Sequence, residues 1–301
     1  MGKASRRQRQ AGGAAATKPA PAPFVRRPFE GLAGETDWVA MREIVPAATA
    51  QVRLGPGALE GTGAQAAASR TVTVATVLPM AWPGLRRADG ELLIGLQTGA
   101  SGSDPSRDVA KVILELAVTV PGTPLRPGVP ATADTPRLQE LLDLDAPFEV
   151  SMHDGFDFWV AEGADLDEAG RQSLEQANAS MVPTEKLEAA PSAYWCRVGD
   201  RTHVRWVLPE DEDRATDALA RLHAAGADTL GEQTRLLGAF RASGLLIPVW
   251  DLDPELPGTA YEAALAELAL RYAEALADNT SLTPEQRRAR SGLLSRQLTL
   301  R

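Results

Sequence analysis

Three carboxylates directly follow a short apolar run and are the side chains best placed for metal chemistry. Asp251, Asp253 and Glu255 come just after residues 245–250. Oxygen donors at the carboxyl end of a buried strand are a common way to hold a hard divalent cation. If these carboxylates converge, the pattern predicts a metal-dependent hydrolase. The same residues also suit an exposed turn that begins at Asp253-Pro254, which is the interpretation we favour.

A second acidic group surrounds a histidine. His153, Asp154 and Asp157 lie within five residues of one another, beside the aromatic residues at 156, 158 and 159. A histidine with nearby carboxylates indicates a metal site or a general acid–base pair. The spacing matches no specific zinc pattern. Asp154-Gly155 is equally a good turn for a hairpin of two strands over 148–152 and 156–160. A site that joined His153 to Asp251 and Asp253 would indicate an enzyme.

A loop of small residues offers a third kind of chemistry. Gly99, Ser101 and Gly102 precede Asp104-Pro105, where a helix is expected to begin. Backbone N–H groups of such a loop can bind a phosphate at the helix N-terminus. However, the loop lacks the lysine of a P-loop, and Asp104 would repel an anion. The alternative to a nucleotide-binding loop is an ordinary connection between strand and helix.

Cys196 and His203 fall on two strands that are expected to pair. A thiol beside an imidazole can act as an activated nucleophile. No third group that would orient the histidine is identifiable, and a buried cysteine usually behaves as a small apolar residue. We therefore favour a structural role for Cys196.

One tryptophan falls in a predicted turn rather than in a predicted core element. Trp82 precedes Pro83-Gly84 in a chain that has six tryptophans and few other aromatic residues. Exposed tryptophans are frequent anchors at protein interfaces. Trp82 is therefore a candidate contact for a protein partner.

The composition is that of a soluble globular protein. The chain has 301 residues, of which 44% are hydrophobic and 24% charged. These values exclude a collagen-like chain and a wholly disordered one, and a single cysteine excludes an internal disulfide framework. No run approaches the ~18 apolar residues of a membrane helix. We expect a cytoplasmic protein without a membrane partner.

Charge is distributed unevenly along the chain. Residues 1–27 hold seven basic side chains and no acidic one, which leaves 24 basic and 40 acidic residues in the rest, a net charge of -16. An acidic body repels DNA and RNA, whereas a basic tail attracts them. We expect Lys3, Arg6, Arg7 and Arg9 to contact RNA, the ribosome or another acidic partner. The alternative is a tail that only increases solubility.

The first half of the chain predicts alternating helices and strands. We expect helices over 36–44 and from Asp104 onward, with strands over 49–54, 71–78 and 91–97. An aspartate N-cap followed by proline is a typical helix start. The turn at 88–90 should lead into the last strand. Residues 120–135 are rich in Pro, Gly and Thr, so a first lobe is predicted over 28–130 and a second over 131–301.

The second half predicts a similar mixture. We expect helices over 166–181, 230–242 and 261–276 and from residues 210 and 283, a hairpin over 193–198 and 202–208, and a strand over 245–250. The fold class is therefore α+β, with two lobes of small antiparallel sheets covered by helices and a disordered basic tail. Residues 71–118 and 193–224 share one order of elements, which indicates either an internal duplication or two unrelated units.

One region resembles a known family. Residues 27–32, 37–40 and 42–50 are similar to an uncharacterised actinobacterial domain of unknown function, and the likeness extends toward the C-terminus. The resemblance implies no activity, ligand or catalytic residue. Some relatives carry a cysteine-rich zinc motif similar to the tail of the SecA translocase, and members are labelled SecA or topoisomerase II. Residues 1–27 contain neither Cys nor His, and the chain lacks a Walker A pattern, so those labels find no support here.

These observations favour a non-enzymatic interaction protein that needs no cofactor. The alternative is a metal-dependent hydrolase that uses the acidic group near Asp251, or a nucleotide-binding protein that uses the loop near Gly99. A concave pocket where polar groups from both halves of the chain converge would favour the enzyme.

Overall fold

The computed structural model describes residues 20–63, 70–99, 102–161, 163 and 165–294. Within these residues the chain forms seven α-helices and eleven strands. The helices are α1 (Glu35–Glu43), α2 (Pro105–Val118), α3 (Leu138–Leu141), α4 (Glu168–Ala179), α5 (Glu212–Ala224), α6 (Glu262–Ala277) and α7 (Pro284–Leu294). The strands form a six-stranded and a five-stranded sheet, so the predicted α+β class with two sheets is confirmed.

The first sheet has the order β5-β3-β4-β2-β1-β6. Its strands are β1 (Ala48–Arg53), β2 (Thr71–Ala75), β3 (Gly84–Arg86), β4 (Leu92–Gly95), β5 (Thr123–Pro124) and β6 (Val150–Met152). The predicted turn at 88–90 exists, but it joins β4 to β3, a strand that the sequence analysis missed. Strand β4 then lies parallel to β2, because β3 and the 3-10 helix η1 (Pro79–Ala81) reverse the chain between them. One pair in this sheet is thus parallel rather than antiparallel.

Strand β6 carries the first sheet beyond residue 130. It pairs with β1 through Ala48↔Met152 and Ala50↔Val150. The predicted hairpin around Asp154-Gly155 does not form, because a 3-10 helix, η2 (Asp157–Trp159), stands where its second strand was expected. The chain therefore passes from the first sheet to the second between β6 and β7, and α4 lies in that connecting segment.

The second sheet has the order β10-β11-β9-β8-β7, and all its pairs are antiparallel. Its strands are β7 (Thr184–Leu187), β8 (Ala193–Val198), β9 (Arg201–Trp206), β10 (Arg235–Ala242) and β11 (Leu245–Asp251). The predicted hairpin of β8 and β9 is confirmed. The predicted helix over 230–242 is wrong, since β10 forms a hairpin with β11 instead. Pairing with the apolar strand β11 outweighs the weak local helical pattern there.

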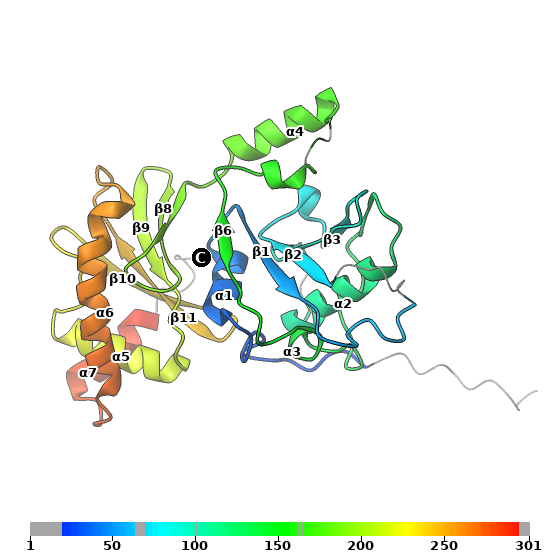
Figure 1. The fold of residues 1–301 in the computed structure, drawn as a ribbon. Helices are drawn as coiled ribbons and strands as arrows, with labels where there is room; N and C mark the ends of the chain where they lie inside the picture. The colour runs from blue at the N-terminus through cyan, green and yellow to red at the C-terminus, as the bar shows by residue number, and fades with distance from the viewer. Residues whose placement is uncertain (1–19, 64–69, 100–101, 162, 164, 295–301) are drawn as a thin grey trace, which may run out of the picture.

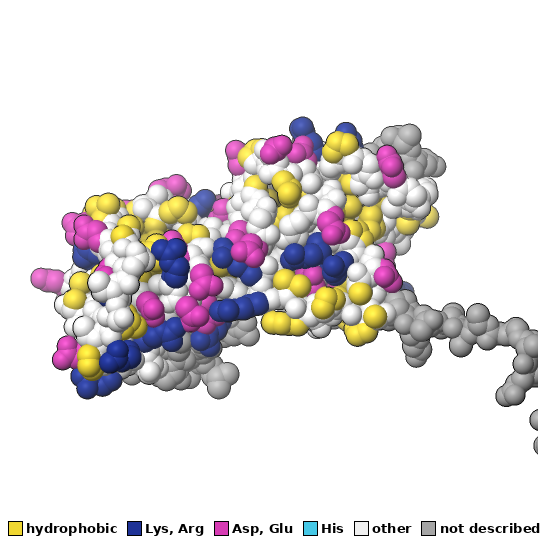
Figure 2. All heavy atoms as spheres, turned by 90° about the horizontal axis from the view of Figure 1, so that it is seen from below, with side chains coloured by type: hydrophobic (Ala, Val, Ile, Leu, Met, Phe, Trp, Pro, Cys, Tyr) yellow, Lys and Arg dark blue, Asp and Glu magenta, His cyan; other side chains and the backbone are white. Residues whose placement is uncertain are grey.

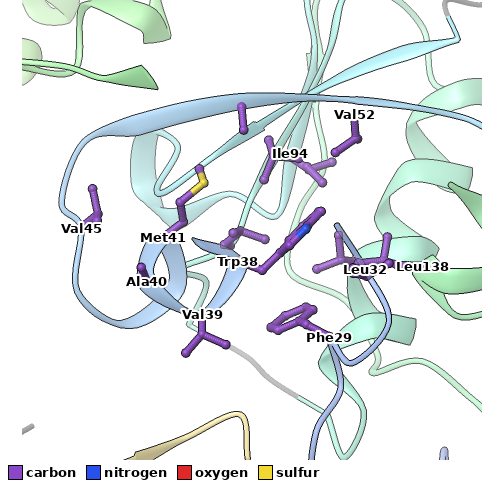
Figure 3. Close-up of a cluster of buried hydrophobic side chains, with 14 of the residues drawn as sticks. Phe29, Leu32, Trp38, Val39, Ala40, Met41, Val45, Val52, Ile94 and Leu138 are labelled. Atoms are coloured by element: carbon purple, nitrogen blue, oxygen red, sulfur yellow. The ribbon is translucent and has the colours of Figure 1, made fainter. Parts of the chain in front are cut away.

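Helix α1 lies between the two sheets (Figure 1). Its buried face carries Trp38, which stacks between Phe29 and Phe148 with ring centroids 5.6 and 4.5 Å away. Figure 3 shows this cluster, in which Trp38 lies among Phe29, Leu32 and Leu138. The same buried cluster includes Phe240 and other residues of the second sheet, so one continuous core joins the two lobes.

The two sheets are covered differently. Helices α5 and α6 and residue Leu293 of α7 pack with one face of the second sheet, in a cluster around Trp250 and Trp206. The helices α1, α2 and α3 share one buried cluster on a single face of the first sheet. On the opposite face a small cluster of Ala75, Leu78 and Leu93 is partly covered by aromatic side chains of η2.

The segment before α1 is anchored to the body. The backbone N–H of Val25 donates to the carbonyl of Ser103 at 3.1 Å, and Pro21 bridges to Thr132. Residues 20–27, which the sequence analysis assigned to the disordered tail, thus contact the folded part. Seen from below, basic and acidic side chains interleave across the middle of the molecule (Figure 2).

Two further observations complete the fold. Residues 71–118 contain a parallel strand pair, whereas residues 193–224 hold a simple antiparallel hairpin, β8 and β9, followed by α5. The two segments therefore differ in topology despite their similar order of elements. Across the described part of the chain, we find no helix that is both long and apolar enough to cross a membrane.

Candidate functional site

A hollow of about 470 Å³ lies where the N-terminal segment meets both lobes. We call it the interlobe hollow and define it by Phe24, Arg26, Arg42, Glu212, Arg241 and Gly244. Those residues come from the segment before α1, from α1 and α5, and from the hairpin of β10 and β11. The site is thus built from parts of the chain that are far apart in sequence.

A buried glutamate organises two arginines of the interlobe hollow. Glu212 accepts a hydrogen bond from Arg26, Nη2 to Oε2, at 2.7 Å, and a second from Nε of Arg241. The side chain of Glu212 is 8% exposed, whereas those of Arg26 and Arg241 are 57% and 44% exposed. The hydrogen bond to Glu212 and the attraction of its charge raise the pKa of Arg26. Glu212 therefore holds both guanidinium groups in place while they face solvent.

Further charges of both signs lie at the interlobe hollow, since Asp211 and Asp213 also act on Arg26 and Arg42 pairs with Glu43 at 3.5 Å. Arg42 also lines it, and Glu43 is the second carboxylate beside Glu212. Three arginines therefore face two glutamates. Arginine is suited to binding phosphate because its planar guanidinium donates two parallel hydrogen bonds. The guanidinium groups of Arg26 and Arg241 are about half exposed, so they can donate further hydrogen bonds to an acceptor outside the protein.

A tight turn brings the second lobe against the N-terminal segment. Ser243 and Gly244 connect β10 to β11 with φ of 48° and 81°. A Cβ at position 244 would lie 2.6 Å from the carbonyl oxygen of Arg26, so only glycine fits there. This close approach fixes Arg26 beside Glu212.

Arg27 ties the same segment to both lobes. Its guanidinium donates two hydrogen bonds to Glu35 of α1, at 2.5 and 2.7 Å, and a third to the carbonyl of Pro209 at 2.7 Å. The hydrogen bond to Glu35 raises the pKa of Arg27. These contacts with both lobes therefore fix the N-terminal segment that forms one wall of the interlobe hollow.

This site was not predicted from the sequence. Arg26 was assigned to the tail, and Arg42 and Arg241 were given no role, because arginines occur throughout the chain. A weak signal was present in the basic run of residues 26 and 27 next to the predicted start of the fold. The contribution of Arg241 had no sequence signal, since it depends on the hairpin that replaced a predicted helix.

The predicted phosphate loop borders a second hollow. Gly99 and Gly102 line a small cleft of about 80 Å³ between β4, α2 and residues 126–130, which we call the α2 cleft. The carboxylate of Asp108 accepts a hydrogen bond from the backbone N–H of Gly102, at 2.6 Å. It also accepts one from the N–H of Ala131, at 2.9 Å. Asp108 thus occupies the donors that a phosphate would need. Ser101, the third predicted residue of the loop, lies outside the described residues.

The carboxylates at the end of β11 and just after it do not converge. Asp251 faces His203 and Arg235, with the closest charged atoms 3.7 Å apart in each case. Asp253 instead forms a turn, in which its carboxylate accepts a hydrogen bond from the backbone N–H of Glu255 at 2.9 Å. The favoured interpretation of an exposed turn therefore fits Asp253 and Glu255.

His153 belongs to the other sheet. It follows β6, and its Nε2 lies 2.8 Å from the hydroxyl of Thr49 on β1. Burial lowers its pKa. Asp157 begins η2, and no group of three or more His, Cys, Asp or Glu residues within the described parts of the chain could hold a metal ion. His153 and Asp251 therefore lie in different sheets and do not form the enzyme site that was considered.

Cys196 and His203 are direct neighbours across β8 and β9, as predicted. The pairing of β9 with β11 adds Asp251 to this row, and its carboxylate is the third group that the sequence analysis did not identify. However, Cys196 is only 2% exposed, and burial raises the pKa of its thiol. A protonated thiol shielded from solvent is a poor nucleophile.

Trp82 is half-buried rather than fully exposed. It packs with Leu85 against the small cluster around Leu78. Its neighbour Met80 is 84% exposed and adopts a positive φ of 54°. The turn therefore presents Met80 rather than Trp82 to solvent. The predicted polyanion contacts Lys3, Arg6, Arg7 and Arg9 lie outside the described residues.

Comparison with known proteins gives one match. Residues 28–301 match the model of a family described as a family of unknown function, DUF5926. No curated protein and no solved structure matches the chain. The match begins where the anchored N-terminal segment leads into α1 and continues through both sheets. Since it spans most of the chain, the protein belongs to the DUF5926 family.

Proposed function

We propose that this protein is a non-enzymatic, cytoplasmic RNA-binding protein. Its basic tail, with Lys3, Arg6, Arg7 and Arg9, makes the first electrostatic contact. The arginines of the interlobe hollow then extend this contact onto the folded body. The acidic remainder of the surface repels the RNA backbone and so limits binding to this region.

The observation that carries the proposal is the position of the interlobe hollow relative to the tail. The described chain begins at Ala20, and Arg26 already lies beside Glu212 in the hollow. An RNA strand that is bound by residues 1–19 is therefore held close to Arg26, Arg42 and Arg241. Phe24, which is 79% exposed at the edge of the hollow, offers a ring on which a base can stack.

The tail is tested by measuring RNA affinity with and without it. A fluorescent single-stranded RNA of mixed sequence is titrated with the full chain and with a chain that lacks residues 1–19, from 50 to 200 mM salt. The truncation keeps residues 20–27 because they anchor the interlobe hollow. It removes five basic side chains, so the slope of log K against log salt should fall by up to about 3.5. A full-length variant with these five residues changed to Gln should behave like the truncated chain.

The hollow is tested by Phe24→Ala, with Leu270→Ala as a matched control. Both side chains are largely exposed, at 79% and 69%, so neither change should alter stability much. Loss of one stacking contact should weaken RNA binding by about 1–3 kcal/mol in Phe24→Ala alone. Equal affinity of the full and truncated chains, or capture of an acidic protein but no RNA, would overturn the proposal.

A further inference from the structure

The open face of the first sheet carries a third hollow, which we call the sheet hollow. Its floor is formed by side chains of β1, β2 and β4, and its rim by β6, residues 146–147 and η2. We define it by Gln51, Thr73, Leu93, Glu149 and Phe158. Its volume is about 660 Å³, which lies within the ~300–1,000 Å³ that is usual for a small-molecule site.

Only side chains of the central strands face the sheet hollow. Strand β1 pairs with β2 on one side and with β6 on the other, and β2 also pairs with β4. The backbone N–H and C=O groups of these strands are therefore bonded within the sheet. Because Ala50 and Val52 are buried on one face, the opposite face presents the polar side chains of Thr49, Gln51 and Thr73. A peptide cannot add a strand here, so side chains must recognise the ligand.

The charges of the sheet hollow balance. Arg87 and Glu91 pair with each other at 2.5 Å, and Glu91 also accepts a hydrogen bond from the hydroxyl of Thr73 at 2.7 Å. The other charged side chains of the lining are one cation, Arg53, and one anion, Glu149. Neither sign is in excess. A phosphate chain or an acidic molecule needs an excess of positive charge, so the sheet hollow favours a neutral ligand.

The remaining groups suit a ligand that is rich in hydroxyls. The side chains of Gln51 and Ser151 are exposed and form no hydrogen bond with another side chain or backbone group in the described parts of the chain. Each of them can donate and accept hydrogen bonds, whereas Arg53 adds donors and Glu149 adds acceptors. The half-buried ring of Phe158 lies at the rim. A sugar matches both features, because its hydroxyls donate and accept and its C–H groups pack on the electron-rich face of an aromatic ring.

We propose that the sheet hollow binds a short neutral saccharide, with its hydroxyls on Gln51, Ser151 and Glu149 and one sugar ring against Phe158. A wholly apolar ligand would cover the amide and hydroxyl groups of the floor without bonding to them, which is costly. A nucleic acid would gain nothing from the balanced charges. The saccharide is thus the ligand class that satisfies the polar floor and the aromatic rim together.

The test is calorimetric titration of the full chain with a panel of neutral trisaccharides: maltotriose, cellotriose, mannotriose and tri-N-acetylchitotriose. Trigalacturonate is the acidic counterpart of the same length. At least one neutral trisaccharide should saturate at a single site. Trigalacturonate should bind more weakly than that trisaccharide, because no excess of positive charge compensates its carboxylates.

Two pairs of variants locate the binding. Gln51→Leu removes an amide and keeps a side chain of similar size, so it should weaken binding of that trisaccharide about three- to tenfold. Gln172→Leu is the matched control, because Gln172 is also exposed but lies on α4 outside the sheet hollow. Phe158→Leu removes the ring and should also weaken binding about three- to tenfold. Its control is Phe24→Leu, since Phe24 lines the interlobe hollow instead.

Three results would overturn this inference. The first is the absence of saturable binding of every neutral trisaccharide in the millimolar range. The second is equal affinity of Gln51→Leu and Gln172→Leu when both variants unfold at the same temperature as the unmodified chain. The third is tighter binding of trigalacturonate than of any neutral trisaccharide. None of these measurements depends on RNA, so the inference and the proposed function can fail independently.

Discussion

The two sheets of this molecule differ in how many of their faces are buried. Every residue from Leu245 to Trp250 of β11 is buried, because helices cover one face of the second sheet and the first lobe covers the other. Strand β1 of the first sheet alternates instead, with Ala48, Ala50 and Val52 buried and Gln51 and Arg53 exposed. The continuous apolar run of β11 thus marks a strand that is covered on both faces, and the alternation of β1 marks a strand with one face toward solvent.

The difference also locates the hollows. The α2 cleft lies in the first lobe, between β4 and α2, and the interlobe hollow lies where the N-terminal segment meets both lobes. The row of Cys196, His203 and Asp251 in the second sheet runs from a buried thiol to a carboxylate that is 31% exposed. The first sheet and its loops form the α2 cleft, whereas the interlobe hollow also takes Glu212 and Arg241 from the second lobe.

The largest effect should come from the core shared by the lobes. Trp38→Ala removes the ring that stacks on Phe29 and Phe148, and it should lower the free energy of unfolding by about 3–5 kcal/mol. Trp82→Ala changes a half-buried ring on the opposite face and should cost about 1–2 kcal/mol. Urea denaturation followed by circular dichroism measures both. Equal losses would show that the two faces of the first sheet are not buried differently in solution.

A medium effect should come from the turn that joins the second sheet to the N-terminal segment. Gly244→Ala adds a Cβ at positive φ that would meet the carbonyl of Arg26 at 2.6 Å. Gly199→Ala, in the turn between β8 and β9, also has a positive φ but meets nothing within 4 Å. We expect losses of roughly 2–4 kcal/mol and roughly 1 kcal/mol respectively, measured by thermal unfolding. If Gly199→Ala is as damaging as Gly244→Ala, the contact with Arg26 does not hold the lobes together.

The smallest effect concerns one histidine on each sheet. Burial lowers the pKa of both His153 and His203 below the ordinary value of 6.5. The unfolded chain then binds more protons than the folded one as the pH falls below that value. Their contribution to stability is therefore full above pH 6.5 and is lost on acidification. His203 lies deeper in its sheet than His153 does. His203→Asn should therefore reduce the change in the free energy of unfolding between pH 7.5 and 5.5 more than His153→Gln does. The midpoints of urea denaturation measure this change. The opposite order would contradict the difference in burial.

Local sequence patterns predicted several elements because their signals act within a few residues. Asp104 caps α2 by accepting a hydrogen bond from the N–H of Ser106 at 3.1 Å, and Pro105 begins the helix. The helix expected from residue 283 begins with a capping box, in which Thr283 and Gln286 exchange two hydrogen bonds at the start of α7. Such contacts need no partner from elsewhere in the chain, so the sequence alone indicates them.

Elements that depend on distant partners were predicted poorly. Strand β10 was expected to be a helix, because nothing local reveals that it will pair with β11. Strand β3 has three residues and too little pattern to be recognised, although it makes β4 run parallel to β2. The loop at Gly99 was correctly placed before α2, because the start of that helix has a local signal. The hydrogen bond from the N–H of Gly102 to Asp108 was not predicted.

By itself, the sequence determined the α+β class, the helix ends with capping residues, the buried run of β11 and the excess of positive charge in residues 1–27. Those properties follow from residue type and short-range spacing. Only the tertiary structure decided that Arg26 and Arg241 meet at Glu212, that His153 and Asp251 belong to different sheets, and that Asp251 joins Cys196 and His203. The physical reason is that strand pairing and the packing of α1 between the sheets bring together residues that no local interaction connects.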